Sequence, residues 1–138
     1  MEETIKCGGI VIIKDNQVLL VKHGQKAEHL NDTFGIPSGR LYKDESEINC
    51  AIRELKEETN LDTTTQNLKA MPNIYIATIK RKTEGTKTFS MKIFKCAKFS
   101  GELKGNKETI PVWIKLSELN KLNLLPNVKK IIKDSLNY

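Results

Sequence analysis

The segment from Glu45 to Thr59 limits what this chain can fold into more than any other part of the sequence. Apolar residues recur there with the spacing of one helical face, at Ile48, Ala51, Ile52 and Leu55. On a neighbouring face of the same helix, Glu54, Glu57 and Glu58 stand at positions i, i+3 and i+4. The segment therefore predicts an amphipathic helix that crowds its carboxylates onto one face.

This crowding is unfavourable for a helix that only faces solvent. Like charges at this spacing repel one another by about 0.2–0.5 kcal/mol per pair, and the helix dipole disfavours anions near the C-terminal end, where Glu57 and Glu58 lie. A bound hard cation removes the repulsion, because Mg²⁺ takes oxygen ligands and keeps waters that a phosphate can replace. We therefore predict a Mg²⁺ site on this face, which Mn²⁺ can also occupy.

Strand signals on both sides of this helix indicate the fold class. Two runs rich in β-branched residues, 10–13 and 18–21, flank the turn Asp15-Asn16 and predict a hairpin, and Asn31 to Leu41 is predicted to be a loop. Further strands are expected at 73–80, 87–98 and 110–114, and closing helices at 116–122 and 127–136. This order of elements predicts an α+β fold with a mixed β-sheet.

Length and composition exclude several classes of protein. The 138 residues, 38% of them hydrophobic, predict one domain over 1–138. No window approaches the roughly 18 consecutive apolar residues of a membrane span, and the acidic start after Met1 lacks the pattern of a secretory signal. Cys7, Cys50 and Cys96 are too far apart for a disulfide framework or a CxxC zinc site. We expect a cytoplasmic protein without a membrane partner, whose cysteines are small apolar fillers of the core.

The charge is divided unevenly along the chain. Residues 1–79 hold 9 basic and 12 acidic side chains, whereas residues 80–138 hold 14 basic and 5 acidic ones. This division suits a nucleic-acid surface, or an anionic ligand held between an acidic metal site and a basic wall. A lysine-rich face that is merely solvated explains it equally well.

The predicted helix belongs to a longer pattern. Five residues separate Gly39 from Glu45, and seven separate Glu45 from the run Arg53-Glu54-Leu55-Lys56-Glu57-Glu58-Thr59-Asn60-Leu61. This pattern resembles the signature box of the Nudix hydrolases. Asn60 stands where the family has Gly, and Ser38 stands where a second Gly is commoner; Asn adopts the left-handed backbone at modest cost. With strand order and length counted, the resemblance covers essentially the whole chain.

The resemblance implies an α/β/α sandwich in which this loop and helix bind divalent metal and a diphosphate linkage is hydrolysed. Carried over by position, Glu57 and Glu58 would be metal ligands, Glu54 a further ligand or the general base, and the Gly39 carbonyl would complete the metal shell. Arg53, four residues before Glu57, would fix the orientation of that carboxylate. We group Arg53, Glu54 and Glu57 as the predicted catalytic residues.

Further acidic residues and one histidine are candidates for roles at or near this site. Some members of the family draw a further metal ligand from a loop before a late strand, which implies Glu108 here, with Glu102 as the alternative. Glu45 is expected to support the loop or Arg53, or else to be a favourable anion in the first helical turn. His23 ends a predicted strand and can face the site, although an ordinary core or surface histidine is the favoured interpretation.

Candidate substrate contacts lie outside the box. Lys80 and Lys82 are the chosen phosphate contacts, although strand alternation sends them to one face and Arg81 to the other, so that one set at most can face the ligand. Asn127 resembles the base-contacting Asn of MutT-type enzymes, but it is equally a plain helix N-cap. Phe34 is a candidate for stacking on the base, and the alternative is that it belongs to the core.

The leading hypothesis is a Mg²⁺-dependent, MutT-like hydrolase that converts a nucleoside triphosphate to the monophosphate and pyrophosphate. Its partner is then a nucleotide substrate, and the protein is expected to be a monomer or a homodimer. A dinucleoside polyphosphate, a nucleotide sugar or an RNA 5′ end is the alternative substrate. The rival from another class is a non-catalytic module that binds a nucleotide or RNA.

Overall fold

The computed structural model describes residues 4–24 and 32–138. Its elements are β1 (Ile5–Val11), β2 (Ile13–Lys14), β3 (Gln17–His23), β4 (Thr33–Gly35), β5 (Ser38–Arg40), α1 (Glu47–Thr59), η1 (Thr65–Asn67), β6 (Leu68–Arg81), β7 (Gly85–Cys96), β8 (Thr109–Lys115), η2 (Leu116–Lys121) and α2 (Val128–Leu136). Each predicted strand overlaps an observed one, but the run 10–13 is divided between β1 and β2, and β6 begins at Leu68 rather than at residue 73. The predicted loop from Asn31 begins outside the described residues.

The strands form two sheets. The first has the order β5-β1-β7-β6, in which β1 and β7 are parallel and the other neighbours antiparallel. In the second sheet, β3 pairs antiparallel with β2, β4 and β8. The predicted α+β fold with a mixed sheet is confirmed, and the chain adds a second, antiparallel sheet to it.

The predicted hairpin is confirmed in part. Its two-residue turn has positive φ at both Asp15 (52°) and Asn16 (61°), as hairpin turns that match the twist of the strands require. The first predicted run, however, is divided between the sheets. Ile10 pairs with Phe94 of β7 in the first sheet, whereas Ile13 pairs with Val18 of β3 in the second.

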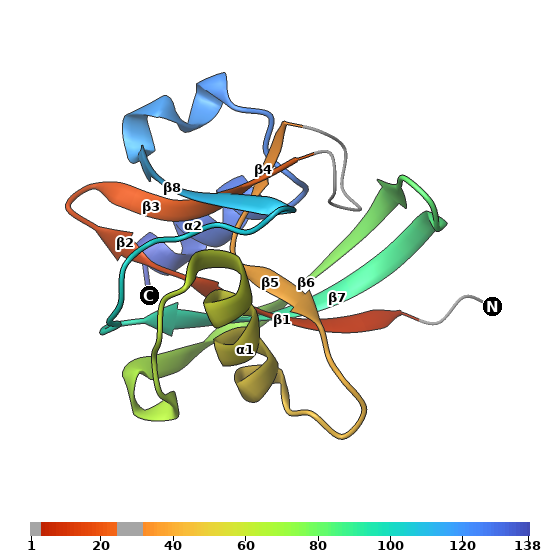
Figure 1. The fold of residues 1–138 in the computed structure, drawn as a ribbon, viewed down its shortest axis with the longest axis horizontal. Helices are drawn as coiled ribbons and strands as arrows, with labels where there is room; N and C mark the ends of the chain where they lie inside the picture. The colour runs from red at the N-terminus through yellow and green to blue at the C-terminus, as the bar shows by residue number, and fades with distance from the viewer. Residues whose placement is uncertain (1–3, 25–31) are drawn as a thin grey trace.

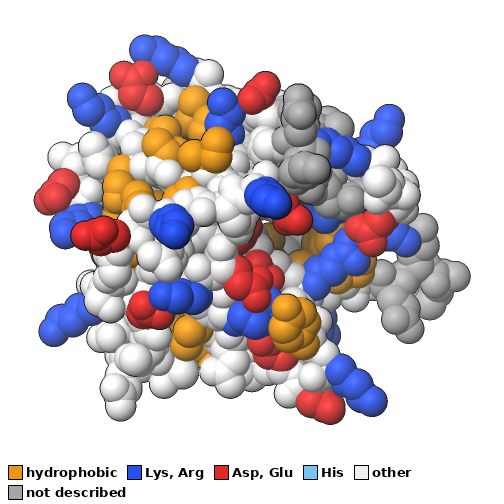
Figure 2. All heavy atoms as spheres, in the orientation of Figure 1, with side chains coloured by type: hydrophobic (Ala, Val, Ile, Leu, Met, Phe, Trp, Pro, Cys, Tyr) orange, Lys and Arg blue, Asp and Glu red, His pale blue; other side chains and the backbone are white. Residues whose placement is uncertain are grey.

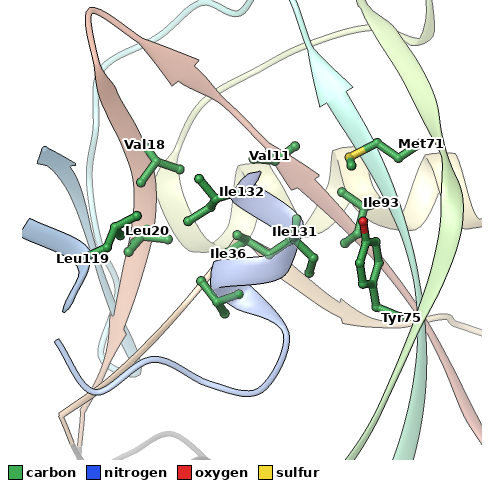
Figure 3. Packing of buried hydrophobic residues seen from close by; sticks show 11 residues of the cluster. Val11, Val18, Leu20, Ile36, Met71, Tyr75, Ile93, Leu119, Ile131 and Ile132 are labelled. Atoms are coloured by element: carbon green, nitrogen blue, oxygen red, sulfur yellow. The ribbon is translucent and has the colours of Figure 1, made fainter. Parts of the chain in front are cut away.

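Alternation along β1 and β3 sends successive side chains to two separate cores. One core joins these strands to α2 and includes Val11, Val18, Leu20, Ile131 and Ile132, shown in Figure 3. The other joins them to α1 and includes Ile10, Ile12, Leu19, Ala51 and Leu55. The strands therefore lie between α1 and α2 (Figure 1), which is the expected α/β/α sandwich.

The expected loop up to Leu41 contains two short strands instead. β4 pairs with β3, and β5 pairs with β1 through the partners Cys7 and Arg40. The prediction was wrong because Gly35, Pro37 and Gly39 signal irregular structure locally, whereas the strands depend on partners distant in sequence. This pairing holds the segment that leads into α1 against the first sheet.

The helices also differ from the prediction at their boundaries. α1 begins at Glu47, because the Ser46 hydroxyl caps it by accepting from the Asn49 amide at 3.2 Å. Glu45 therefore precedes the helix, and its interpretation as a first-turn anion was wrong. The segment expected as a helix at 116–122 is the 3₁₀ helix η2, over Leu116–Lys121.

The C-terminal end of α1 follows the prediction. Asn60 adopts the left-handed conformation with φ 68°, and its amide bonds to the Lys56 carbonyl. Leu61 then packs into the core beside α1, with 1% of its surface exposed. Cys7, Cys50 and Cys96 are buried free thiols, as predicted. Within residues 4–24 and 32–138, no helix is long and apolar enough to cross a membrane.

Candidate active site

A cavity of about 240 Å³ opens where α1, both sheets and the segment before α2 meet. Glu54, Glu58 and Glu108 lie on its lining together with Arg40, Arg81 and Asn127. Acidic side chains gather near the centre of the face in Figure 2, where α1 lies in Figure 1, and basic side chains lie close by. The cavity therefore brings acidic and basic groups from distant parts of the sequence into one space.

Glu58 is the most unusual of the acidic residues because α1 turns it into the interior. Its Oε1 accepts a hydrogen bond from the Ser38 amide at 2.7 Å. Burial and then the nearby charge of Glu54 raise the pKa of Glu58 well above its ordinary value, although the Ser38 bond lowers it. The ionised carboxylate is thus held in an environment that disfavours its charge.

Glu54 lies directly against Gly39. A Cβ on Gly39 would stand 2.2 Å from the Glu54 carboxyl carbon, so any residue with a side chain would displace the carboxylate. Burial raises the pKa of Glu54 to about 6, against the effect of its hydrogen bond from Arg53. The structure therefore brings two predicted members of the metal site together, and a side chain at position 39 would shift the Glu54 carboxylate from its place.

Arg53 connects the acidic residues. It donates to both carboxylate oxygens of Glu45 at 2.8 Å, to Glu54 at 2.8 Å and to Glu57 at 3.3 Å. These bonds lower the pKa of Glu45 to about 2 and raise that of Arg53. The predicted contact between Arg53 and Glu57 and the predicted support of Arg53 by Glu45 are both present.

The remaining predicted metal ligands occupy different positions. Glu108 lies on the cavity lining, in the loop before β8, where its amide donates to Asn106 Oδ1 at 2.7 Å. Glu57 is 48% exposed and lies beside the cavity rather than on its lining. The alternative, Glu102, also lies outside the lining, and its carbonyl accepts from the Asn60 side chain at 3.0 Å. Of the two loop candidates, the structure thus brings Glu108 to the site.

The donor chemistry of this site fits a divalent cation. In the described part of the chain, no three acidic, histidine or cysteine side chains converge as a ready-made metal site, since Glu54 and Glu57 face Arg53 and Glu58 faces Ser38. The site nevertheless offers several carboxylates, which are the ligands that Mg²⁺ prefers. Burial, together with the nearby charge of Glu54, raises the pKa of Glu58, and a cation bound beside this carboxylate would offset that cost.

The chosen phosphate contacts on β6 are corrected by the structure. Alternation places Ala77, Ile79 and Arg81 on the cavity lining, whereas Lys80 is exposed on the other side of the strand. Lys82 follows the strand and donates to the Gly24 carbonyl at 3.3 Å. The prediction from strand alternation was therefore correct in placing Arg81 opposite Lys80, but the face that lies on the cavity is the one with Arg81.

The two other proposed substrate contacts have different outcomes. Asn127 lies on the cavity lining, with φ 70°, and its side chain donates to the Ile76 carbonyl at 2.9 Å instead of capping α2. The N-cap position predicted for Asn127 is confirmed, but its side chain makes no capping bond to α2. Phe34 packs against the core that contains α2 and lies outside the cavity lining, which corrects its assignment as a base-stacking residue.

Sequence reasoning missed some of the cavity lining. Arg40 follows Gly39 directly, and this position next to the box was the available signal. His23 lies on the lining, which is the alternative that the sequence left open, whereas an ordinary histidine was the favoured interpretation. Its Nδ1 lies 3.2 Å from the Thr33 carbonyl, and burial lowers its pKa, so the imidazole is neutral at pH 7. Phe89 also lines the cavity, and its signal was hidden in a regular strand pattern.

Comparison with known proteins places this geometry in context. Residues 6–135 match the model of the NUDIX domain. A MutT NUDIX hydrolase from Burkholderia pseudomallei superposes with a TM-score of 0.78 over 96% of this chain and 98% of that one, at 18% identity. A bifunctional NMN adenylyltransferase/ADP ribose pyrophosphatase from Francisella tularensis, complexed with AMP and Mn, superposes with a TM-score of 0.71 over 99% and 42%, at 22% identity. At these identities the two structures establish similarity of fold.

A shorter match is found in sequence. The mRNA decapping complex subunit 2 of Schizosaccharomyces pombe is 40% identical over 55 residues, which are 40% of this chain and 7% of that protein. The m7GpppN-mRNA hydrolase of Saccharomyces cerevisiae is 35% identical over 65 residues, or 46% of this chain and 6% of that protein. The chain thus spans a small part of the length of the relatives it matches.

Proposed function

The chain belongs to the NUDIX domain family, and from this premise we propose that it is a divalent-metal-dependent hydrolase of the diphosphate linkage in a nucleoside triphosphate, releasing the monophosphate and pyrophosphate. One observation carries the proposal. A single cavity has carboxylates, Glu54, Glu58 and Glu108, and guanidinium groups, Arg40 and Arg81, on its lining. Such a cavity can hold a metal and the phosphates of one substrate at the same time.

The metal would be held by carboxylates and one carbonyl of this chain. Glu57, Glu58 and Glu108 would supply carboxylate oxygens, and the Gly39 carbonyl would supply a neutral oxygen. A bound divalent cation neutralises phosphate oxygens and lowers the pKa of water near it. Arg53 keeps Glu57 in place through its bonds at 3.3 Å.

Glu54 is the proposed general base. With a pKa of about 6, it is mostly ionised at neutral pH and still basic enough to accept a proton from water. It also lies on the cavity lining, where the water that attacks phosphorus must stand. Its bond from Arg53 at 2.8 Å fixes the carboxylate in this position.

The rest of the lining suits a nucleoside. Tyr75, Phe89 and Leu125 give apolar surface, and Asn127 presents an amide, which can pair with a donor and an acceptor of a base. Tyr75 is fixed by its hydroxyl, which donates to Asp134 at 2.6 Å. These residues support a nucleotide rather than inorganic pyrophosphate as the substrate.

An RNA 5′ end is the second candidate substrate, and one surface feature favours it. A wide groove lined by Lys129, Lys130 and Lys133 shares Leu125 and Asn127 with the cavity. A nucleic-acid strand whose 5′ phosphates lay in the cavity could continue along this basic groove. The short sequence matches are to an mRNA decapping complex subunit and an m7GpppN-mRNA hydrolase.

The test is a substrate panel with product analysis. The protein is incubated with Mg²⁺ and nucleoside triphosphates, dinucleoside polyphosphates, nucleotide sugars or 5′-triphosphorylated and capped RNA, with Glu54→Gln as the inactive control. Pyrophosphate released from one triphosphate supports the proposal. If only RNA is hydrolysed, the second candidate substrate is the correct one. If no substrate is hydrolysed although nucleotides still bind, the protein is a binding module and not an enzyme.

A further inference from the structure

Glu84 lies in the turn between β6 and β7 and binds two arginines from opposite edges of the first sheet. It forms an ion pair with Nη2 of Arg40 on β5 and lies 3.5 Å from Nε of Arg81 at the end of β6. In the order β5-β1-β7-β6, these two strands are the edges. One carboxylate thus joins arginines that the sheet itself holds two strands apart.

Phe89 on β7 contacts both guanidinium groups. The Cζ atoms of Arg40 and Arg81 each lie 5.4 Å from the centre of its ring, a distance at which a cation is attracted to an aromatic face. The ring is buried, with 5% of the residue exposed. Because Phe89 is fixed by its strand, it gives both arginines a rigid surface to lie on.

Arg40 is also fixed to α1 through its main chain. Its carbonyl accepts from Arg53 Nη2 at 3.0 Å, and Arg53 in turn binds Glu54 and Glu57. The backbone of Arg40 is therefore tied to the acidic part of the site, while Glu84 ties its side chain to the β6–β7 turn.

Both arginines line the cavity, whereas Glu84 lies outside its lining. A guanidinium has five N–H donors in a planar fork, so a carboxylate and a phosphate can contact it at the same time. We propose that Glu84 is a positioning residue, which holds Arg40 and Arg81 as a pair that receives the phosphates of the substrate. This inference rests on the proposed function and adds to it the residue that arranges phosphate recognition.

If Glu84 instead competed with the substrate for the arginines, the predicted change in substrate binding would have the opposite sign. If its carboxylate competed with the phosphates for the arginines, its removal would strengthen substrate binding. If it positions the arginines, its removal weakens binding, because each guanidinium must then be ordered when the substrate arrives. The sign of the change in KM therefore separates the two roles.

The experiment measures the kinetics of Glu84→Ala with the best substrate of the panel. We expect KM to rise about five- to tenfold while kcat stays within about twofold of the wild type, since ground-state contacts are weakened. Glu84→Gln should give a smaller rise, because its amide oxygen still accepts from a guanidinium. The melting temperature should fall only slightly, because the Arg40–Glu84 pair is exposed and the Arg81 side chain, although only 12% exposed, keeps its contact with Phe89.

Glu118→Ala is the matched control. Glu118 is also in an exposed ion pair, with Lys121 at 2.8 Å, but outside the cavity lining, so the same change of charge should leave KM unaltered. In an Arg40→Ala background, Glu84→Ala should have a much smaller effect, because the pair to be positioned is already broken. Full additivity of the two changes would contradict the proposal.

Calorimetry with a non-hydrolysable nucleoside triphosphate separates this inference from the proposed function. If the wild type binds the analogue but hydrolyses nothing, the proposed function fails and weaker binding by Glu84→Ala still supports the positioning role. If the wild type hydrolyses its substrate and Glu84→Ala has an unchanged or lowered KM, the positioning role alone is overturned. Absence of any binding by the wild type overturns both.

Discussion

The two helices of the sandwich cover opposite faces of the strands but differ in what they bury. α2 buries Val128, Ile131 and Ile132, together with Ser135, and its Lys130 pairs with Asp134 near the surface. α1 buries Leu55 in the same manner, but also Glu58, whose hydrogen-bond donor is a backbone amide. A buried carboxylate close to other carboxylates opposes folding. The face of α1 that carries Glu58 is therefore unfavourable for stability, and it is this face that we assign to function.

The largest expected effect of a substitution lies in α1. Glu54→Gln should lower kcat about 10²–10⁴-fold, because the amide cannot accept a proton from water, while the fold stays intact. Steady-state kinetics with the preferred substrate measures the loss. Glu47→Gln, in the first turn of the same helix, is the control and should keep wild-type activity. Wild-type kcat in Glu54→Gln would remove Glu54 as the base and leave Glu108 as the next candidate.

α2 should show the opposite behaviour. Ile132 is 2% exposed in the core and lies outside the cavity lining, so Ile132→Ala should reduce the free energy of unfolding by about 2–5 kcal/mol through lost burial and a cavity. Urea unfolding measures this, and kcat of the folded fraction should be unchanged. Leu136→Ala, at a residue that is 54% exposed, should change stability by less than about 0.5 kcal/mol. A kcat loss in Ile132→Ala would mean that α2 affects the reaction.

A smaller effect of opposite sign is expected at Glu58. Its raised pKa means that the folded protein holds this proton more tightly than the unfolded chain does, so its contribution to stability is present at low pH and is lost as pH rises. At pH 8, far above the ordinary pKa of a glutamate, the buried Glu58 is therefore destabilising in the metal-free protein. Glu58→Gln, which keeps an acceptor for the Ser38 amide, should therefore raise the free energy of unfolding by about 1–3 kcal/mol at pH 8.

The dependence on pH and metal makes the Glu58 prediction specific. The gain should shrink towards pH 5, as Glu58 of the wild type becomes protonated. The lowered pKa of His23 destabilises both proteins when pH falls below its ordinary value, so the difference between them isolates Glu58. Mg²⁺ should raise the melting temperature of the wild type more than that of the variant. Equal stability of the two proteins at pH 8 without metal would contradict the burial argument.

Local spacing was enough to predict much of α1. Positions i and i+4 of a helix are neighbours, so the Arg53–Glu57 contact followed from the sequence alone, and the turn after the helix followed from Asn60. The contacts of β5 could not be predicted in this way, because Arg40 comes close to Phe89 through pairing with β1, far earlier in the chain. Likewise, alternation separated Lys80 from Arg81, but which of them faces the cavity depends on how β6 lies in its sheet.

The smallest effect is expected from a pair of identical residues at helix ends. Asn60 follows α1 with φ 68° and Asn127 precedes α2 with φ 70°, a backbone that glycine adopts without strain. At Asn60, Gly relieves strain but loses the bond to the Glu102 carbonyl and adds entropy to the unfolded chain. We therefore expect Asn60→Gly to reduce the free energy of unfolding by about 0.5 kcal/mol.

Asn60 and Asn127 have the same backbone conformation, but their substitution should affect KM differently. Asn60→Gly should keep the wild-type KM, because this side chain faces the Glu102 loop. Asn127→Gly should raise KM about 2–10-fold, since it removes an amide from the cavity lining, which is the range expected for one lost hydrogen bond. Urea unfolding and steady-state kinetics on both variants test this. If KM changes equally in both variants, substrate binding depends on the left-handed backbone at the helix ends and not on the amide on the cavity lining. The contrast between α1 and α2 would then be limited to stability.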